Sequence, residues 1–289
     1  MGGQNVDVWP AFGPMSSNET TGGRLRVAAV SYLNTLPFLY GLEQTCGAEV
    51  VDLQLAVPSQ CVAPLRQGLV DVALVPVATL PELGDVEPIT TFCIGANGPV
   101  RTVCLCANEP VERIRRIYLD PDSRTSVALV QHLAPAHWGI DPDYAPFRAG
   151  GILPQLREGE AVLMIGDKVF THGDSFPYRY DLAEAWCAYS GLPFVFAVWV
   201  APKSVASSLS ARLEPSLAWG VSHIAEALEA HPPAPHIGRE AAYDYLTRCI
   251  DYRLDGDKRF AMRLFLQLLR NGQVLVERDV HDTDSDDGQ

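Results

Sequence analysis

Apolar runs alternate with mixed polar and apolar segments along the first part of the chain. The compact apolar runs have the pattern of buried strands, and the segments between them have the start and stop signals of helices. Pro37 falls in the first turn of one predicted helix, where proline costs no hydrogen bond, and Gly68 ends the next. This β-α-β-α-β order predicts a parallel sheet with helices on its faces. We expect strands at 25–30, 49–56 and 71–75, and helices at 36–42 and 58–68.

The middle of the chain continues the alternation, and the last part shows helical patterns only. Pro215 lies between two of these helical stretches and is expected to break or kink them, because proline inside a helix removes a hydrogen bond. The middle part has predicted strands at 103–107, 117–119, 144–147, 161–165 and 194–200 and helices at 123–133 and 182–189. The last part has predicted helices at 204–213, 217–230, 238–249 and 257–269.

A mostly helical C-terminal part after a full α/β unit indicates a chain that leaves one lobe, builds a second and returns. We expect lobe one to consist of 24–97 and 198–276, and lobe two of 98–197. The predicted fold class is therefore α/β, with two lobes and a cleft between them. Such a cleft is a natural binding site for a small molecule.

The 289 residues carry a formal net charge of −13. A chain this acidic offers no basic face to a phosphate backbone or an anionic membrane, which argues against nucleic acid and membrane as partners. Much of the charge lies near the ends, since 277–289 holds six acidic residues and one arginine. That tail and the polar, glycine-rich segment 1–23 are expected to be disordered. A local pocket in the remaining chain can still bind a small anion.

Signals for export, metals and nucleotide cofactors are absent from the sequence. The start has no basic region followed by an apolar stretch, and the most apolar run, 191–201, is shorter than a membrane helix. We therefore expect a cytoplasmic protein. The seven cysteines form no C-x-x-C pair, so neither a disulfide framework nor a metal site is predicted. Nucleotide-binding glycine motifs, a G-x-S-x-G elbow and H-E-x-x-H are also missing, so we expect no cofactor.

Polar loops follow several predicted strands, at the ends where open α/β sheets bind ligands. The loop with Ser31, Tyr32 and Asn34 leads into a helix N-terminus and offers donors to an anion. The alternative is that Ser31 or Asn34 only caps this helix. A second loop turns at Pro99 and reaches Thr102, which in isolation is interpreted as a structural residue at a strand start.

The strongest anion-binding signal is a cluster of three hydroxyls and one guanidinium at the start of a predicted helix. Ser123 can cap this helix while Thr125 and Ser126 present O–H and N–H donors to a ligand. Arg124 has a fork geometry suited to a carboxylate. The cluster therefore indicates a carboxylate-binding position.

A further loop places Gly166 and Asp167 directly after a buried strand. The carboxylate of Asp167 then lies at the edge of a sheet. It can bind a ligand hydroxyl, cap the next helix or pair with Lys168, and the sequence leaves these three roles open.

An ordered series of motifs runs through these loops and strands. The series consists of SYLNTLPFLYGL at 31–42, GLVDVALVP at 68–76, GPVRTV at 98–103, SRTSV at 123–127, IGD at 165–167, YDL at 180–182 with Trp186, and GLPFVFA at 191–197 with Trp199. In this order the chain resembles the chorismate dehydratase family of the futalosine route to menaquinone over about 24–199.

This resemblance implies a two-lobed fold similar to type II periplasmic binding proteins, used inside the cell as an enzyme. The implied reaction removes water from chorismate, a dianion, to give 3-[(1-carboxyvinyl)oxy]benzoate without a metal or cofactor. Asn34 and Thr102 are implied as catalytic residues, with Thr102 in place of the family serine, so the hydroxyl remains and a methyl is added. The implied substrate-binding residues are Ser31, Tyr32, Pro99, Val100, Ser123, Arg124, Thr125, Ser126, Gly166 and Asp167.

Chorismate suits the candidate loops, because the helix start at 123–126 would hold one of its two carboxylates. Asn34 and Thr102 would orient the ether side chain and the departing hydroxyl. No protein base is evident for the proton on the ether-bearing ring carbon, and the side-chain carboxylate of the substrate is a candidate. The protein then contributes mainly positioning and a dry cleft.

Three other functions of related folds stay open. A non-enzymatic solute-binding protein for small carboxylates would need a secretory signal or a lipid anchor. The sister enzyme that makes 1,4-dihydroxy-6-naphthoate shares the fold and opens with a different motif. A ligand-sensing regulator would carry a helix-turn-helix, which 1–23 cannot form. The sequence does not fix the oligomeric state, so a homodimer remains open.

Overall fold

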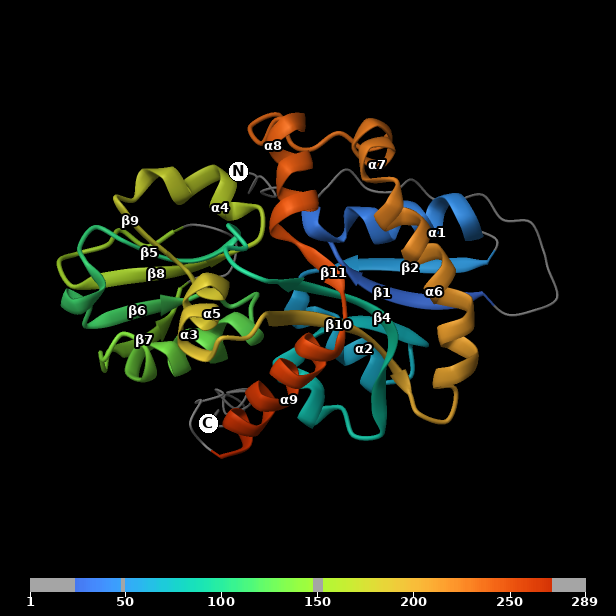
Figure 1. Ribbon diagram of the computed structural model, residues 1–289, viewed down its shortest axis with the longest axis horizontal. Helices are drawn as coiled ribbons and strands as arrows, with labels where there is room; N and C mark the ends of the chain where they lie inside the picture. Colours follow the sequence, from blue (N-terminus) through green and yellow to red (C-terminus); the bar gives the residue numbers. More distant parts are fainter. Residues whose placement is uncertain (1–23, 48–49, 148–152, 272–289) are drawn as a thin grey trace, which may run out of the picture.

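Two sheets divide the protein into two lobes that lie side by side (Figure 1). The computed structural model describes residues 24–47, 50–147 and 153–271, so the segments 1–23 and 277–289 lie outside the described residues. The larger sheet has the order β11 (Asp251–Arg253), β4 (Val86–Ala96), β10 (Phe194–Pro202), β3 (Val72–Pro76), β1 (Leu25–Val30) and β2 (Val51–Ala56). The smaller sheet has the order β7 (Asp143–Pro146), β6 (Arg116–Leu119), β8 (Glu160–Ile165), β5 (Val103–Ala107) and β9 (Tyr178–Asp181).

Both sheets are mixed rather than purely parallel. The expected parallel arrangement is confirmed where β1 pairs with β2 and β3. It is wrong for the rest of the larger sheet, because β10 runs antiparallel to both β3 and β4. β10 arrives from the smaller lobe and therefore begins at the end of the larger sheet where β3 and β4 finish.

The chain crosses between the sheets at two places. It leaves the larger sheet after β4 and begins β5 at Val103, and it returns from α5 (Leu182–Ser190) into β10 at Phe194. The smaller lobe between these crossings also contains α3 (Thr125–Ala136) and α4 (Lys168–His172). The two-lobed α/β fold expected from the sequence is thus confirmed.

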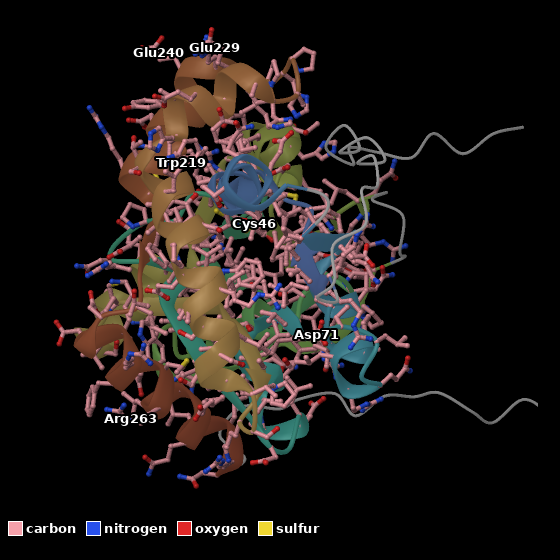
Figure 2. All side chains as sticks on the ribbon, turned by 90° about the vertical axis from the view of Figure 1, so that its right-hand side faces the viewer. Cys46, Asp71, Trp219, Glu229, Glu240 and Arg263 are labelled. Carbon is pink, nitrogen blue, oxygen red and sulfur yellow. The ribbon has the colours of Figure 1, made fainter. Side chains whose placement is uncertain are left out.

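Helices cover the larger sheet on both faces (Figure 1). One helix, α1 (Leu36–Cys46), crosses α6 (Ala206–Ser222), and Figure 2 shows this pair with Cys46 and Trp219 labelled. The crossing is made by two glycines: a Cβ on Gly41 would lie 2.0 Å from the carbonyl oxygen of Ser216, and one on Gly220 would lie 1.9 Å from that of Pro37. The remaining helices of this lobe are α2 (Val62–Arg66), α7 (Ile224–Ala230), α8 (Arg239–Asp244) and α9 (Gly256–Arg270).

Pro215 lies inside α6, which runs without a break from Ala206 to Ser222, so of the break or kink expected there the break is wrong. The proline removes one backbone hydrogen bond, whereas Leu213 and Leu217 on either side are completely buried against the core. Burial of two leucines is worth about 3–6 kcal/mol, which outweighs the lost bond.

Three strands were not expected from the sequence, namely β4, β9 and β11. The last of these also overturns the expectation of helices alone after residue 204. β4 carries alternating exposed and buried residues in its first half, with Pro88 among them, which obscures a strand pattern. The predicted helix 238–249 is α8 followed by a π-helical turn, Tyr245–Cys249. In the described part of the chain, no helix has the length and apolar composition needed to cross a membrane.

Candidate functional site

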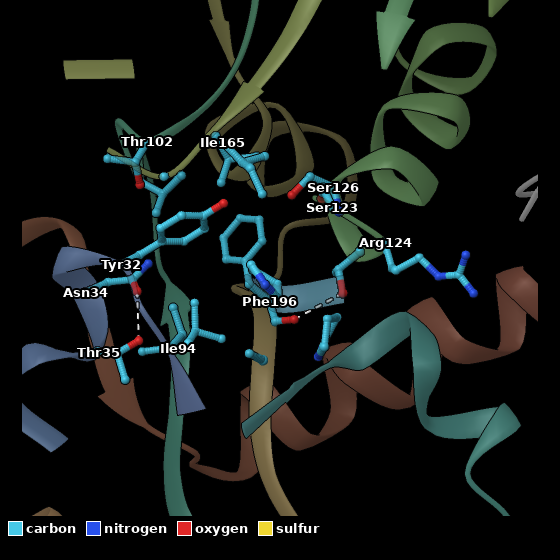
Figure 3. A pocket seen from close by; sticks show the side chains of 18 residues that line it. Tyr32, Asn34, Thr35, Ile94, Thr102, Ser123, Arg124, Ser126, Ile165 and Phe196 are labelled. Carbon is cyan, nitrogen blue, oxygen red and sulfur yellow. Dashed lines mark hydrogen bonds between the residues drawn. The ribbon is translucent and has the colours of Figure 1, made fainter. Parts of the chain in front are cut away.

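A cavity lies between the lobes, where the loops after β1 and β8 meet the segment before β5 and the start of α3 (Figure 3). Its empty volume, including the open mouth, is about 560 Å³, of which about 60 Å³ is open to the centre of a water-sized sphere. The wall is largely apolar, with Ile94, Ile165 and Phe196 among its residues. The predicted site residues that line it are Tyr32, Asn34, Val100, Thr102, Ser123, Arg124, Thr125, Ser126 and Gly166.

Three predicted site residues, Ser31, Pro99 and Asp167, do not line this cavity. The hydroxyl of Ser31 donates to the carbonyl of Ala56 at 3.4 Å, inside the larger lobe. Asp167 instead joins the lobes, because both of its carboxylate oxygens lie 3.2 Å from the backbone nitrogen of Leu33. Asp167 therefore links the two lobes next to the cavity without being part of its wall.

Tyr32 packs directly on Gly166 across the same junction. Gly166 has a φ of 65°, and a Cβ at this position would lie 2.8 Å from a ring carbon of Tyr32. The backbone conformation and the close approach both require glycine here. The ring of Tyr32 thus sits where only a residue without a side chain leaves room.

The hydroxyl of Tyr32 is buried and has no hydrogen-bond partner among the described residues. Figure 3 shows it pointing into the cavity between Ile165 and Phe196. Burial raises the pKa of Tyr32 far above its usual value, and the charges of Asp120 and Asp122 add to this rise. Tyr32 is therefore a neutral O–H donor, and a buried donor without a partner points to a ligand or an ordered water.

The hydroxyl cluster at the start of α3 is divided between structural and cavity-facing roles. Ser123 accepts the backbone N–H of Ser126 at 3.1 Å, which is the capping contact expected of it. Thr125 donates to the carbonyl of Phe196 at 3.1 Å and accepts the N–H of Ala78 at 3.2 Å. Thr125 therefore ties α3 to the larger lobe, while the hydroxyl of Ser126 points toward the cavity (Figure 3).

The side chain of Arg124 extends away from the cavity (Figure 3). Its Nη2 lies 3.4 Å from Oε2 of Glu82 in the larger lobe. In this arrangement the guanidinium is turned toward a protein carboxylate, and the expected contact of Arg124 with a ligand carboxylate stays a prediction. Anion binding in the cavity would depend on O–H and N–H donors.

Lys168 pairs with two carboxylates beside the cavity rather than with its neighbour Asp167. Its Nζ lies 2.7 Å from Oδ2 of Asp120 and 3.0 Å from Oδ2 of Asp122. Burial raises the pKa of Asp120, and the charge of Lys168 opposes this rise. The three residues form a compact ion cluster that fixes the loop leading to Ser123.

Thr102 and Asn34 meet at a buried tyrosine that the sequence reasoning missed. Oγ1 of Thr102 lies 2.7 Å from the hydroxyl of Tyr245, and both residues are 1% exposed. Burial raises the pKa of Tyr245 strongly, and hydrogen bonds with the side chains of Thr102 and Asn34 partly lower it. The hydroxyl of Tyr252 also donates to the carbonyl of Asn34 at 2.9 Å. No local motif marks Tyr245, which lies in a helical segment far from both residues in sequence.

Arg101 holds the crossing segment next to Thr102. It has a φ of 64°, an unusual value for a residue with a side chain. Its N–H donates to Oδ2 of Asp181 at 2.6 Å, and its guanidinium donates to Oδ2 of Asp244 at 2.7 Å. Two carboxylates thus stabilise the strained conformation that directs Thr102 toward Tyr245.

Solved structures show that the protein has the two-lobed fold of periplasmic binding proteins. Protein AF1704 from Archaeoglobus fulgidus has a TM-score of 0.63 at 14% identity, over 87% of this chain and 98% of that one. The alkanesulfonate-binding protein SsuA from Xanthomonas axonopodis pv. citri, bound to MOPS, has a TM-score of 0.62 at 13% identity, over 90% and 96%. The CA3427 gene product of Candida albicans, described as having the generic periplasmic binding protein fold, has a TM-score of 0.55 at 13% identity, over 89% and 92%.

A family model described as menaquinone biosynthesis matches residues 25–271. The chain belongs to this menaquinone biosynthesis family, which places it in that pathway. The match spans both lobes and every residue of the interlobe cavity.

Proposed function

We propose that the protein is a chorismate dehydratase that eliminates water from chorismate to give 3-[(1-carboxyvinyl)oxy]benzoate. The observation that carries this proposal is the convergence of Asn34 and Thr102 on one apolar interlobe cavity, beside the unpartnered hydroxyl of Tyr32. Membership of the menaquinone biosynthesis family supports the pathway. The resemblance of the loop motifs to the chorismate dehydratase family supports the particular reaction.

The reaction removes one proton and one hydroxide from adjacent ring carbons of chorismate. The C–H bond at the ether-bearing carbon breaks, and its electron pair forms a new ring double bond. The C–O bond to the ring hydroxyl breaks, and the hydroxide leaves with a proton as water. The ring becomes aromatic, so no oxidant, reductant or cofactor is needed for the balance.

Thr102 and Asn34 have the chemistry that the departing hydroxyl requires. A hydroxyl and an amide donate hydrogen bonds to an oxygen on which negative charge develops, and such donors act strongly in a dry cavity. Both side chains line the cavity. We assign them to hold the leaving hydroxyl and the ether side chain.

Tyr32 and Ser126 supply donors for the substrate carboxylates. Their hydroxyls point into the cavity from opposite lobes (Figure 3). Arg124 is the one lining side chain that carries a charge among the described residues, and its guanidinium is turned to Glu82. Neutral donors leave the negative charge of the substrate only partly compensated, which favours the substrate's own side-chain carboxylate as the base.

The proposal is tested by incubating the purified full chain with chorismate in the presence of a chelator and following both acids by liquid chromatography and mass spectrometry. Chorismate is expected to disappear with the appearance of one equivalent of the carboxyvinyloxy-benzoate. Persistence of chorismate with folded protein would overturn the proposal. Asn34→Ala is expected to abolish most turnover, whereas Asn108→Ala, on the surface of the smaller lobe, serves as the matched control.

A further inference from the structure

We infer that Tyr245 is a positioning residue for the reaction proposed above, with a hydroxyl that sets the directions of the Thr102 and Asn34 side chains from behind the cavity wall. The expected kinetic effects of Tyr245 rest on the proposed function, whereas its expected effects on side-chain positions rest on the geometry alone. Tyr245 does not itself line the cavity, so it acts through the two residues that do.

The hydroxyl of Tyr245 connects two chain segments that otherwise approach the cavity separately. Asn34 follows β1 in the larger lobe, and Thr102 begins the smaller lobe just before β5. The Tyr245 hydroxyl lies 2.7 Å from that of Thr102, and the Asn34 side chain acts on the same phenol by lowering its pKa. A tyrosine that only filled the core would not need its polar end at this junction.

The protons of this cluster have a preferred arrangement. The phenol of Tyr245 stays neutral because complete burial raises its pKa far above its usual value. Among the described residues, Oγ1 of Thr102 is the acceptor that the hydrogen-bond geometry gives this buried phenol, so the phenol O–H donates to Oγ1 of Thr102. The hydroxyl proton of Thr102 is then left for the cavity, where the departing hydroxide needs a donor.

The neighbours of Tyr245 hold its ring and backbone in place. The ring packs edge-on against Phe170 of the smaller lobe at a centroid distance of 5.2 Å. Asp244 binds the guanidinium of Arg101, so the consecutive residues 101–102 bind the consecutive residues 244–245. Tyr245 also opens the π-helical turn Tyr245–Cys249, a local geometry that is frequent at functional sites.

The test compares Tyr245→Phe, which removes only the hydroxyl, with Tyr180→Phe as the matched control. Tyr180 accepts the N–H of Val111 at 2.8 Å in the smaller lobe and is not part of the cavity wall. Tyr245→Phe is expected to lower kcat for chorismate about 100-fold while KM changes less than about threefold, because misplaced catalytic groups reduce the rate more than binding. In the Thr102→Val background, Tyr245→Phe is expected to cause little further loss of kcat, because both changes interrupt one unit.

A second measurement needs no turnover. The chain contains six asparagines, so the side-chain amide signals of ¹⁵N-asparagine-labelled protein can be assigned with Asn34→Asp. Tyr245→Phe is expected to shift the Asn34 amide signal, and Tyr180→Phe to leave it in place. An unmoved signal overturns the positioning role whether or not chorismate is the substrate. The positioning role is also overturned if Tyr245→Phe turns over chorismate as fast as the wild type. If the wild type has no turnover but the Asn34 signal shifts, only the proposed function is overturned.

Discussion

The carboxylate of Asp167 in the smaller lobe accepts the backbone N–H of Leu33 in the larger lobe, with each oxygen 3.2 Å from the nitrogen. Leu33 lies between Tyr32 and Asn34, which both line the cavity. The bond therefore fixes the cavity loop of one lobe to the strand end of the other. It is a direct link that must break when the lobes separate.

Asp167→Ala is expected to favour open lobes and to raise KM for chorismate about tenfold, since a hydrogen bond to a charged group contributes about 1.5–3 kcal/mol. Small-angle X-ray scattering of the free protein should show a larger radius of gyration for the variant. Asp174→Ala is the matched control, because that carboxylate is 90% exposed and pairs with Arg179 in its own lobe. Equal scattering curves and KM values for the Asp167 variant and the wild type would refute the closing role.

Gly166→Ala is expected to displace the ring of Tyr32 and to weaken chorismate binding at least tenfold. Its Cβ would lie 2.8 Å from a ring carbon of Tyr32, closer than packed atoms allow. Gly191→Ala is a matched control, because Gly191 has a similar φ of 71° but free space where a Cβ would be.

In both glycine variants an alanine adopts the left-handed conformation, which lowers the free energy of unfolding in chemical denaturation by about 1–2 kcal/mol. The difference between them isolates the clash with Tyr32. If isothermal titration gave the same chorismate affinity for both variants, the position of Tyr32 would not matter for binding.

Thr102→Ser is expected to keep kcat within about threefold, because the hydroxyl that donates to the departing group and contacts Tyr245 is retained. Thr102→Val keeps the shape, removes the hydroxyl and should lower kcat at least about 100-fold. The valine variant also leaves the Tyr245 hydroxyl without this partner, which costs about 1–3 kcal/mol of unfolding free energy in urea. Thr90→Val, a buried threonine of β4 that donates to Phe92, should lose stability but keep kcat.

Acid sensitivity is expected from Asp71, which lies on the larger lobe (Figure 2). The side-chain hydrogen bond from Arg26, with Nη2 2.6 Å from Oδ1, lowers the pKa of Asp71 in the folded state. The pair therefore stabilises the fold above the unfolded pKa of about 3.9, and this contribution is lost as pH falls through the lower, folded pKa.

The check is urea unfolding at pH 6 and in steps down to pH 2. Asp71→Asn should be less stable than wild type at the upper pH and equally stable at the lowest. Arg26→Gln, the reciprocal change, should abolish the same pH-dependent difference. A constant gap between Asp71→Asn and wild type at every pH would assign the effect to packing instead.

Much of the site follows from the sequence because loops after buried strands are recognisable by local signals. Tyr32, Asn34 and Thr102 all fall in such loops, and the structure brings all three to one cavity. Local signals do not show which partner a side chain chooses. Arg124 belongs to the predicted cluster yet pairs with Glu82, a residue that only the tertiary fold brings near.

The parts that the sequence did not predict depend on contacts between distant segments. Tyr245 reaches the site because the π-helical turn after α8 lies against the crossing segment, and no residue spacing within that turn encodes the contact. β11 is a three-residue strand that forms only because β4 offers it an edge. Pro215 has the local signature of a helix end, but α6 continues through it because the neighbouring leucines are buried.

The crossing of α1 and α6 has a consequence for how this protein can change over evolutionary time. Gly41 and Gly220 touch through backbone atoms, so neither position can gain a methyl unless the two helices move apart. α1 begins directly after the loop that holds Asn34, so such a movement would be passed to the cavity. A substitution at either glycine therefore affects the packing of the other glycine and the binding of the substrate, although both glycines lie outside the cavity wall.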